Sequence, residues 1–266
     1  MEGFRIDTPL EKYLLKGREV FVKREDLMGD GFLFPRWGKI NAIRNYLEKN
    51  VDKNKPITTL SVDGSWSGWV VSAFCEELDI QHIYSYPNSK KFNTKILDYV
   101  SSIYPSTKLN PIKPNMVSIM FNGLKRRSIE NGTQIIPYGF EHDDFISVFE
   151  ERIKEYNHFD NLIVSSGSGI SLIGLTRGFQ LKKSQRIISV CVSSENTIKK
   201  RLKKYGIHGV EVHKSKYDFS NRMDNYNTPF PTNQFWDRKG WKWLDENIKS
   251  LDGSILFWNL GGEYTY

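Results

Sequence analysis

The stretch Asn161-Leu-Ile-Val-Ser-Ser-Gly-Ser-Gly-Ile-Ser171 joins a short apolar run to a loop rich in glycine and serine. The run from Asn161 to Ser165 predicts a buried strand, and the residues from Gly169 to Phe179 predict a helix. Glycines let backbone N–H groups converge on an anion, and a helix N-terminus adds unpaired donors and a partial positive charge. This order favours an α/β fold with an anion-binding loop at Gly167 to Ser171. A tight turn with a serine N-cap is the alternative for the same residues.

Strand and helix signals alternate along the rest of the chain, which is the α/β pattern. Strands are predicted at 19–23, 57–62, 81–86, 186–192 and 255–258. Helices are predicted at 39–49, 70–78, 145–156, 196–204 and 240–248. Short apolar strands separated by helices predict mostly parallel sheets with helices on both faces.

The composition is that of a globular protein. The chain has 266 residues, of which 39% are hydrophobic and 26% charged, and it contains no apolar run of transmembrane length. The N-terminus lacks the apolar core of a signal peptide, so we expect a cytoplasmic protein. The net charge of +7 favours anionic partners, such as a phosphate cofactor or nucleic acid. We interpret the basic clusters at 125–127 and 199–204 as solvated helix faces.

Metal and redox chemistry find little support in the sequence. Cys75 and Cys191 each lie in an apolar stretch and predict two buried, reduced thiols. No pair of histidines has zinc-site spacing with these cysteines, and the run from His142 to Asp144 predicts a polar helix start. Alanine is nearly absent, which we interpret as the codon bias of an AT-rich genome, with a phage as a hypothetical source.

Lys39 is the candidate catalytic residue. It follows Gly38 at the predicted start of a helix. A catalytic amine is kept near a positive helix end or another cation, where its pKa falls. In most proteins, however, a lysine at a helix start is a surface residue. The motifs elsewhere in the chain favour the catalytic interpretation.

Eight short motifs follow one another along the chain: Thr8-Pro9-Leu10, Lys23 to Leu27 (KREDL), Trp37 to Asn41 (WGKIN), Gly64 to Gly68 (GSWSG), Ile136 to Gly139 (IPYG), Gly167 to Ser171 (GSGIS), Trp236 to Lys239 (WDRK) and Asn259 to Gly262 (NLGG). In this order they resemble the fold-type-II enzymes that depend on pyridoxal 5'-phosphate (PLP), the tryptophan synthase β-like superfamily. The branch they resemble contains aminocyclopropane-carboxylate deaminase and D-cysteine desulfhydrase.

The resemblance implies a fold and an organisation. It implies two open, twisted, mostly parallel sheets flanked by helices, with PLP in the cleft between two domains. Residues 1–48 and 145–266 would form the large PLP-binding domain, and residues 49–144 the small domain. Relatives of this fold are usually dimers, so a homodimer is implied as well.

The resemblance also implies roles for individual residues. Lys39 would form the Schiff base with PLP and move protons at the substrate carbon. Asp237 would lie near the pyridine nitrogen, where a carboxylate strengthens the electron sink. Ser65 would carry a proton or contact the substrate carboxylate, and Trp236 would line the substrate pocket. The phosphate would be bound by Gly167, Ser168, Gly169, Ile170 and Ser171, and the substrate carboxylate by the backbone of Ser65, Trp66, Ser67 and Gly68.

Several positions depart from the family pattern. Trp66 replaces an asparagine beside the cofactor ring, Trp236 replaces a tyrosine of the substrate pocket, and Gly38 replaces the asparagine before the lysine. Asn41 stands in place of an arginine, and Asn259-Leu260 in place of His-Thr. Because the substrate-facing positions differ most, we infer that PLP binding is retained and that the usual substrates are not.

The sequence therefore predicts a PLP-dependent enzyme of lyase, deaminase or isomerase type acting on an amino acid. One hypothesis attaches that amino acid to a nucleobase, as in the hypermodified DNA of phages. The late aromatic residues could stack on such a base or form core and pocket wall: Trp236, Trp241, Trp243, Trp258, Tyr264 and Tyr266. The alternatives are a non-catalytic protein with the PLP fold and a nucleic-acid-binding protein without a recognised motif. A hydrolase is not supported, because the centre of Gly64 to Gly68 is Trp66 and not a nucleophile.

Overall fold

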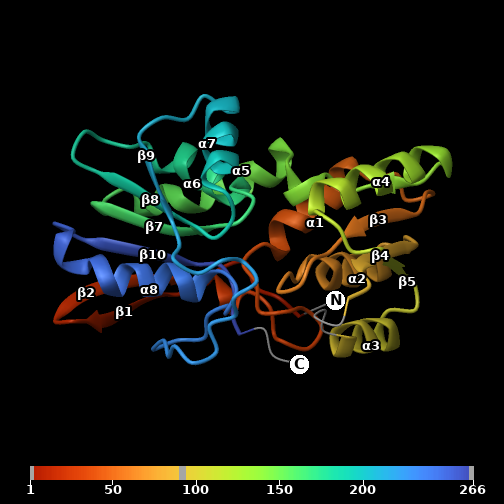
Figure 1. Cartoon of the computed structure of the whole chain (residues 1–266), viewed down its shortest axis with the longest axis horizontal. Helices are drawn as coiled ribbons and strands as arrows, with labels where there is room; N and C mark the ends of the chain where they lie inside the picture. The colour runs from red at the N-terminus through yellow and green to blue at the C-terminus, as the bar shows by residue number, and fades with distance from the viewer. Residues whose placement is uncertain (1–2, 90–93, 264–266) are drawn as a thin grey trace.

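The computed structural model describes residues 3–89 and 94–263, which contain two β-sheets (Figure 1). The larger sheet has six strands in the order β1-β2-β10-β7-β8-β9, and the smaller has four in the order β5-β4-β3-β6. The β1–β2 pair is antiparallel, and the other pairs among the described strands are parallel. The predicted fold class is confirmed.

The elements have the following bounds. The larger sheet contains β1 (Leu10–Leu15), β2 (Arg18–Arg24), β7 (Asn161–Ser166), β8 (Arg186–Cys191), β9 (Val210–Lys214) and β10 (Ile255–Asn259). The smaller sheet contains β3 (Ile57–Leu60), β4 (His82–Pro87), β5 (Thr107–Ile112) and β6 (Gln134–Ile135). The α-helices are α1 (Ile40–Asn50), α2 (Ser67–Glu77), α3 (Thr94–Ile103), α4 (Val117–Glu130), α5 (Asp143–Ile153), α6 (Ile170–Phe179), α7 (Glu195–Lys204) and α8 (Asp237–Asn247). Short 3-10 helices are η1 (Glu25–Leu27), η2 (Tyr138–Phe140), η3 (Lys154–Tyr156) and η4 (Ile248–Ser250).

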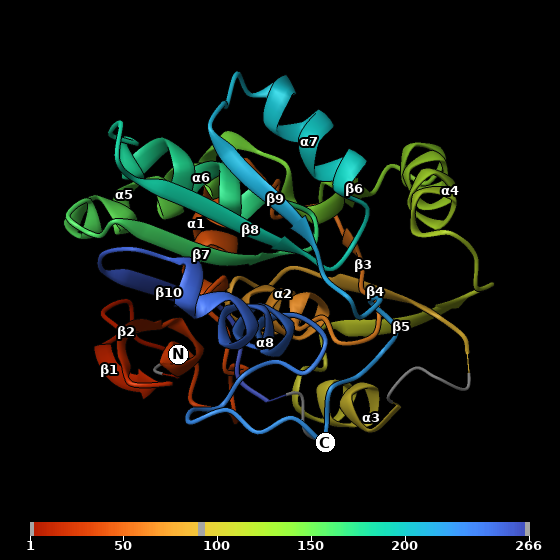
Figure 2. The same cartoon turned by 60° about the vertical axis from the view of Figure 1, so that its left-hand side comes forward.

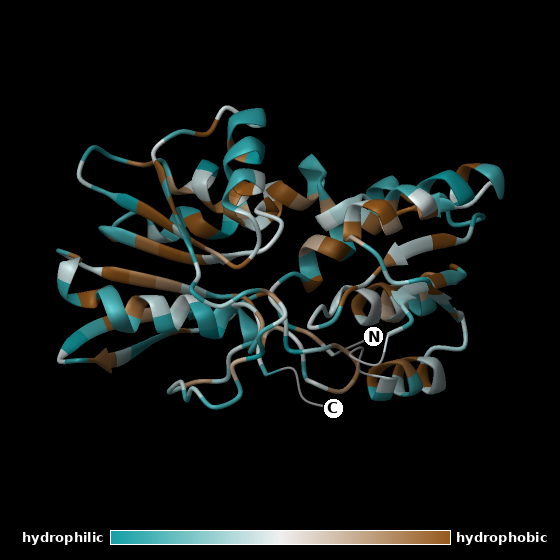
Figure 3. Cartoon of the chain, viewed as in Figure 1, coloured by the Kyte–Doolittle hydropathy of each residue, from teal (hydrophilic) through white to brown (hydrophobic). Residues whose placement is uncertain are grey.

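The larger sheet buries both of its faces, because successive side chains of a strand point to opposite sides. On one face, Ile163 packs in a cluster with Trp241 and Leu244 of α8. On the other face, Leu162 and Val164 join the main core with residues of α5 and α6. Figure 2 shows α8 and the α5–α6 pair on opposite sides of the sheet, and Figure 3 shows hydrophobic residues along its interior strands β7 and β10. Burial on both faces explains why these strands are almost wholly apolar.

Most predicted elements are present with small shifts at their ends. The predicted helix 70–78 begins three residues earlier, at Ser67, so it includes part of the GSWSG motif. His142 is the N-cap of α5 and accepts a hydrogen bond from the Asp144 N–H, as expected for a polar helix start. Cys75 and Cys191 are free and buried, which confirms that prediction. Of the aromatic residues expected in core or pocket, Tyr264 and Tyr266 lie outside the described residues.

Six of the described strands and α-helices were not predicted from the sequence: β1, β5, β6, β9, α3 and α4. The edge strand β1 alternates exposed and partly buried residues, and α4 buries only Met120, Leu124 and Ser128. Elements with so little apolar surface give a weak periodic signal. Among the residues that the structure describes, no helix has the length and apolar character needed to cross a membrane.

Helices α5 and α6 pack at very short range through glycines of α6. A Cβ atom added to Gly178 would lie 2.0 Å from the Glu150 carbonyl oxygen, and one added to Gly174 would lie 2.4 Å from that of Ile146. Both obstacles are backbone atoms, so neither can move aside alone. The close contact fixes α6 against α5, and the glycine–serine loop leads directly into α6.

We predict that Gly178→Ala lowers the free energy of unfolding by about 1–3 kcal/mol, because the added methyl group overpacks the α5–α6 contact. The matched control is Gly123→Ala in α4, where an added Cβ meets nothing within 4 Å. There alanine should stabilise the helix by about 0.5–1 kcal/mol. Urea denaturation of both variants measures the difference, and equal effects would contradict the assignment of this contact.

Candidate active site

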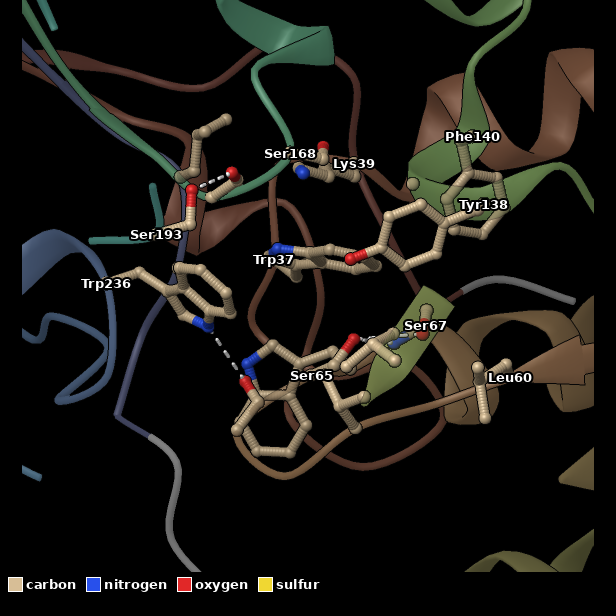
Figure 4. Close-up of a pocket in the computed structure, with 18 of the residues that line it drawn as sticks. Trp37, Lys39, Leu60, Ser65, Ser67, Tyr138, Phe140, Ser168, Ser193 and Trp236 are labelled. Carbon is tan, nitrogen blue, oxygen red and sulfur yellow. Dashed lines mark hydrogen bonds between the residues drawn. The ribbon is translucent and has the colours of Figure 1, made fainter. Parts of the chain in front are cut away.

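A cavity of about 310 Å³ lies where loops from both sheets meet. Its lining comes from the segments that follow β3, β7, β8 and β10, together with α4, η2 and the start of α8. Figure 4 shows Trp37, Lys39, Ser65, Tyr138 and Trp236 around this space. Because ligand sites in parallel α/β sheets lie beyond the carboxyl ends of the strands, this cavity is the expected place for a site.

The structure brings most of the sequence-predicted site residues to this cavity. Those that line it are Lys39, Ser65, Trp66, Ser67, Gly167, Ser168, Trp236 and Asp237. Gly68, Gly169, Ile170 and Ser171 lie behind the lining, within or at the start of α2 and α6. Sequence reasoning gave no role to Trp37, Tyr138, Ser193 or Asn233, which also line the cavity.

Lys39 is the N-cap residue of α1 and is partly exposed, toward the cavity. Its amine lies over the ring of Trp37, 5.3 Å from the centroid. Burial disfavours the ammonium form and lowers the pKa of Lys39 to about 8, while the nearby Asp237 carboxylate acts in the opposite direction. Burial is thus the main cause of the depressed pKa, and Lys39 also stands at the N-terminal end of α1, as the sequence predicted.

Asp237 is the first residue of α8 and is 2% exposed. Its Oδ1 accepts a hydrogen bond of 3.1 Å from the Leu260 N–H. Burial raises the pKa of Asp237 to about 7, against the opposing effects of that hydrogen bond and of the Lys39 ammonium. A lysine and a carboxylate thus share one cavity, and both have pKa values within about a unit of neutral pH.

An ion pair remote in sequence supports the backbone before Lys39. Arg152 of α5 donates to Glu25 Oε2 at 2.7 Å and to the Gly38 carbonyl at 2.9 Å. Glu25 is fully buried, and burial raises the pKa of its carboxyl while Arg152 and Lys23 lower it. A Cβ added to Gly38 would lie 2.5 Å from the Cβ of Glu25. This crowding explains why glycine stands where the resembled family has asparagine.

The glycine–serine loop, Gly167 to Ser171, joins β7 to α6 as predicted. Gly169 has φ of +82° and caps α6, so its backbone needs a residue without a Cβ. Ser193 Oγ donates to the Gly167 carbonyl at 2.7 Å, and Arg201 of α7 donates to the Ser168 carbonyl. These bonds engage carbonyl groups of the loop and leave its N–H groups available to an anion. The sequence analysis interpreted the basic cluster at 199–204 as a solvated helix face. For Arg201 this interpretation is incomplete, because its side chain also binds the loop.

The GSWSG segment begins α2 and is held by a serine network. Ser67 Oγ lies 3.0 Å from Ser61 Oγ and 2.9 Å from Ser65 Oγ. On the opposite wall, Trp236 Nε1 and Asn233 Nδ2 both donate to the Gly64 carbonyl at 3.3 Å. These two bonds connect the loop of the smaller sheet to the segment that enters α8, and Figure 4 shows that of Trp236.

The structure has two mostly parallel sheets, with Lys39 and the glycine–serine loop at the cavity between them. Comparison with solved structures shows that the chain has the fold of the fold-type-II PLP-dependent enzymes. A hydrogen sulfide-producing enzyme from Fusobacterium nucleatum superposes with a TM-score of 0.72 at 14% identity, over 97% of this chain and 94% of that one. An O-acetylserine-dependent cystathionine β-synthase from Helicobacter pylori gives a TM-score of 0.69 at 15% identity, over 96% and 92%. A threonine deaminase from Solanum lycopersicum gives 0.68 at 16%, over 100% and 81%.

A protein of Pseudomonas phage M6 is similar in sequence. It is named glycyl-dTMP PLP-dependent decarboxylase and is 27% identical over 279 residues, covering 96% of this chain and 98% of the phage protein. No family model matches the chain.

The residues present fit a cofactor that bears a phosphate and an aldehyde. The hydroxyl groups of Ser165 and Ser171 are buried beside the glycine–serine loop and have no hydrogen-bond partner among the described residues. A Cβ added to Gly167 would lie 2.2 Å from the Trp236 ring, so the loop passes between this indole and α6 with little room to spare. An amine of low pKa faces the same space. The donor set matches PLP as the resemblance predicts.

We predict that Lys39 reacts with a small acylating reagent with a midpoint near pH 8, because its pKa is about 8. At that pH about half of such amines are neutral, compared with roughly 0.3% of an exposed lysine. In Asp237→Asn the midpoint should fall further, because the carboxylate that favours the ammonium form is gone. Peptide mapping after labelling at several pH values checks both points. A midpoint near 10.5 in the parent protein would contradict the burial argument.

We predict that Arg152→Met costs about 3–5 kcal/mol of unfolding free energy at neutral pH, because it leaves the Glu25 carboxylate buried without its partner. The loss should shrink as the pH falls and Glu25, whose pKa is raised, takes up a proton. Arg126→Met is the control, since the Arg126 side chain is 78% exposed and pairs with the exposed Glu130. Denaturation curves across pH test the expectation, which a pH-independent loss would contradict.

Proposed function

We propose that this chain is a PLP-dependent enzyme that binds its cofactor through Lys39 and transforms an amino-acid substrate. The observation that carries the proposal is the meeting of three features in one cavity: an amine of pKa about 8, a buried carboxylate and a glycine–serine loop whose Gly167 and Ser168 line the space. When bound, PLP supplies an electron sink for negative charge that develops at the substrate α-carbon.

Four parts of the cavity have proposed roles in that chemistry. The loop from Gly167 to Ser171 binds the phosphate through its backbone N–H groups and serine hydroxyls. Asp237 faces the cofactor's ring nitrogen and keeps it protonated. Lys39 carries the cofactor and, as a neutral amine near pH 8, holds or moves a proton at the α-carbon. Ser65 and the start of α2 receive the substrate carboxylate.

The similarity to the phage protein supports a more specific substrate. That relative is named for decarboxylation of glycyl-dTMP, an amino acid carried on a thymidine nucleotide. The substrate-facing residues Trp66 and Trp236 differ from those of the resembled family, and the aromatic cavity wall agrees with a substrate that carries an aromatic ring. We therefore propose chemistry at the α-carbon of an amino acid attached to a nucleobase, with loss of the carboxylate as the favoured reaction.

Four further points belong to the same proposal. The motif order supports the branch of aminocyclopropane-carboxylate deaminase and D-cysteine desulfhydrase. The two sheets support a large domain at 1–48 and 145–266 and a small domain at 49–144. The resemblance supports a homodimer, and the phage relative supports the cytoplasm of a bacterial host.

The proposal predicts that added PLP gives an aldimine absorption band and that borohydride fixes the cofactor on Lys39. Mass spectrometry of the labelled peptide locates the site. Lys239 is an internal control, because burial also lowers its pKa to about 8, yet its amine donates to the carbonyls of Asp218 and Phe219 and is not exposed. Label on Lys39 alone, lost in Lys39→Ala, supports the proposal. Absence of both band and label would overturn it, whereas label without any turnover would favour a non-catalytic PLP-binding protein.

A further inference from the structure

Two aromatic pairs line the cavity on different sides. Phe121 of α4 and Tyr138 of η2 lie with ring centroids 5.7 Å apart at 49°. Phe219 and Trp236, from the segment before α8, lie 4.5 Å apart at 46°. All four residues contribute to the lining. Figure 4 shows Tyr138 and Trp236 on different sides of the cavity, with Trp37 between them in this view.

Tyr138 is 41% exposed although its ring forms part of the cavity wall. The backbone that follows is unusual, because Gly139 and Phe140 have φ of +68° and +60°. For a phenylalanine this conformation is strained and persists only where packing enforces it. Here Phe140 is buried and stacks on Phe145 at 5.2 Å and 18°. The burial of Phe140 thus fixes the turn that places the Tyr138 ring in the cavity wall.

The same turn is connected to the glycine–serine loop. A Cβ added to Gly139 would lie 2.8 Å from the Cβ of Ser168, so the two segments touch. Arg201 donates to the Ser168 carbonyl and to Glu141 Oε2, the latter at 2.9 Å. The position of Tyr138 is therefore fixed relative to the loop that we assign to the cofactor phosphate.

Backbone strain is often found at functional sites, so the strained turn beside Tyr138 suggests that its ring contacts the ligand. Aromatic side chains bind the faces of nucleobases by stacking, and substitution of one such residue weakens binding measurably. The cavity volume of about 310 Å³ is at the small end of the usual range for ligand sites, roughly 300–1,000 Å³. The phage relative is named for a thymidine nucleotide, so a pyrimidine is the base to place in this cavity.

We propose that the Phe121–Tyr138 pair is the binding surface for the pyrimidine ring of the substrate, and that Tyr138 is its main contact. The inference rests on the proposed function, since it assigns a place to the nucleobase of that substrate. It makes Tyr138 and Phe121 determinants of specificity that lie outside the cofactor site.

The test measures binding of dTMP to the PLP-loaded protein by isothermal titration calorimetry. The nucleotide lacks the amino acid, so its binding requires no reaction at Lys39. In Tyr138→Ala the affinity should fall about 5- to 150-fold, and in Tyr138→Phe it should stay close to that of the parent protein, because stacking needs only the ring. Phe121→Ala should weaken binding in the same direction.

The matched control is Phe32→Ala. Phe32 is 62% exposed and belongs to another aromatic pair, with Tyr99 at 6.2 Å, but it does not line the cavity. Unchanged dTMP affinity in this variant, beside the loss in Tyr138→Ala, supports the proposal. Equal dTMP affinities in the two variants would overturn it, and so would a parent protein that binds neither dTMP nor a thymidine oligonucleotide.

A second titration distinguishes a free nucleotide from DNA as the source of the thymine ring. A thymidine oligonucleotide replaces dTMP in the titration, and dependence of its binding on Tyr138 would identify DNA as a ligand. If neither probe binds in a Tyr138-dependent manner, the assignment of this surface is wrong. The PLP absorption band of each variant is recorded beforehand, so a failure of cofactor binding is recognised separately from a failure of base recognition.

Discussion

The Lys39 amine and the Asp237 carboxylate line one cavity, where burial shifts the pKa of both, and this is the constraint on which the rest of the site depends. In such surroundings each charge is costly unless the other is near, so burial moves both pKa values toward neutrality. An amine with a pKa near 8 can act as a general base or acid near neutral pH, which an ordinary lysine cannot do efficiently. The fold must hold both groups in place without giving either a stronger partner.

The surrounding structure meets this requirement through backbone contacts more than through direct contacts with the two side chains. Arg152 and Glu25 hold the peptide before Lys39, and the Leu260 N–H holds the Asp237 carboxylate at the start of α8. The shared Gly64 carbonyl joins the walls of the cavity. Because buried charges such as Glu25 are unfavourable when unpaired, these supports are strongly interdependent.

The sequence predicted those parts of the site that are local in the chain. The glycine–serine loop could be found because a strand, its loop and a helix are consecutive, and Lys39 and Asp237 because short motifs surround them. Arg152 could not be found in this way, since it reaches Glu25 across 127 positions and belongs to an ordinary amphipathic helix. The turn at Phe140 gave no signal, because a left-handed conformation is expected of glycine and not of phenylalanine. The weakly apolar helix α4 was missed because tertiary packing, and not its own periodicity, stabilises it, whereas α3 has a clear apolar face that went unrecognised.

The order of strands in the larger sheet has a consequence for the making of the protein. Residues 21–24 of β2 pair with residues 256–259 of β10, so the centre of that sheet joins the two ends of the chain. While the ribosome is still adding residues, the apolar flank of β2 has no neighbour, whereas all four strands of the smaller sheet have already been synthesised by residue 135. Non-local pairing of this kind is slow and leaves strand edges open to aggregation. The newly made chain therefore carries a β1–β2 hairpin with one open edge until the residues of β10 have emerged.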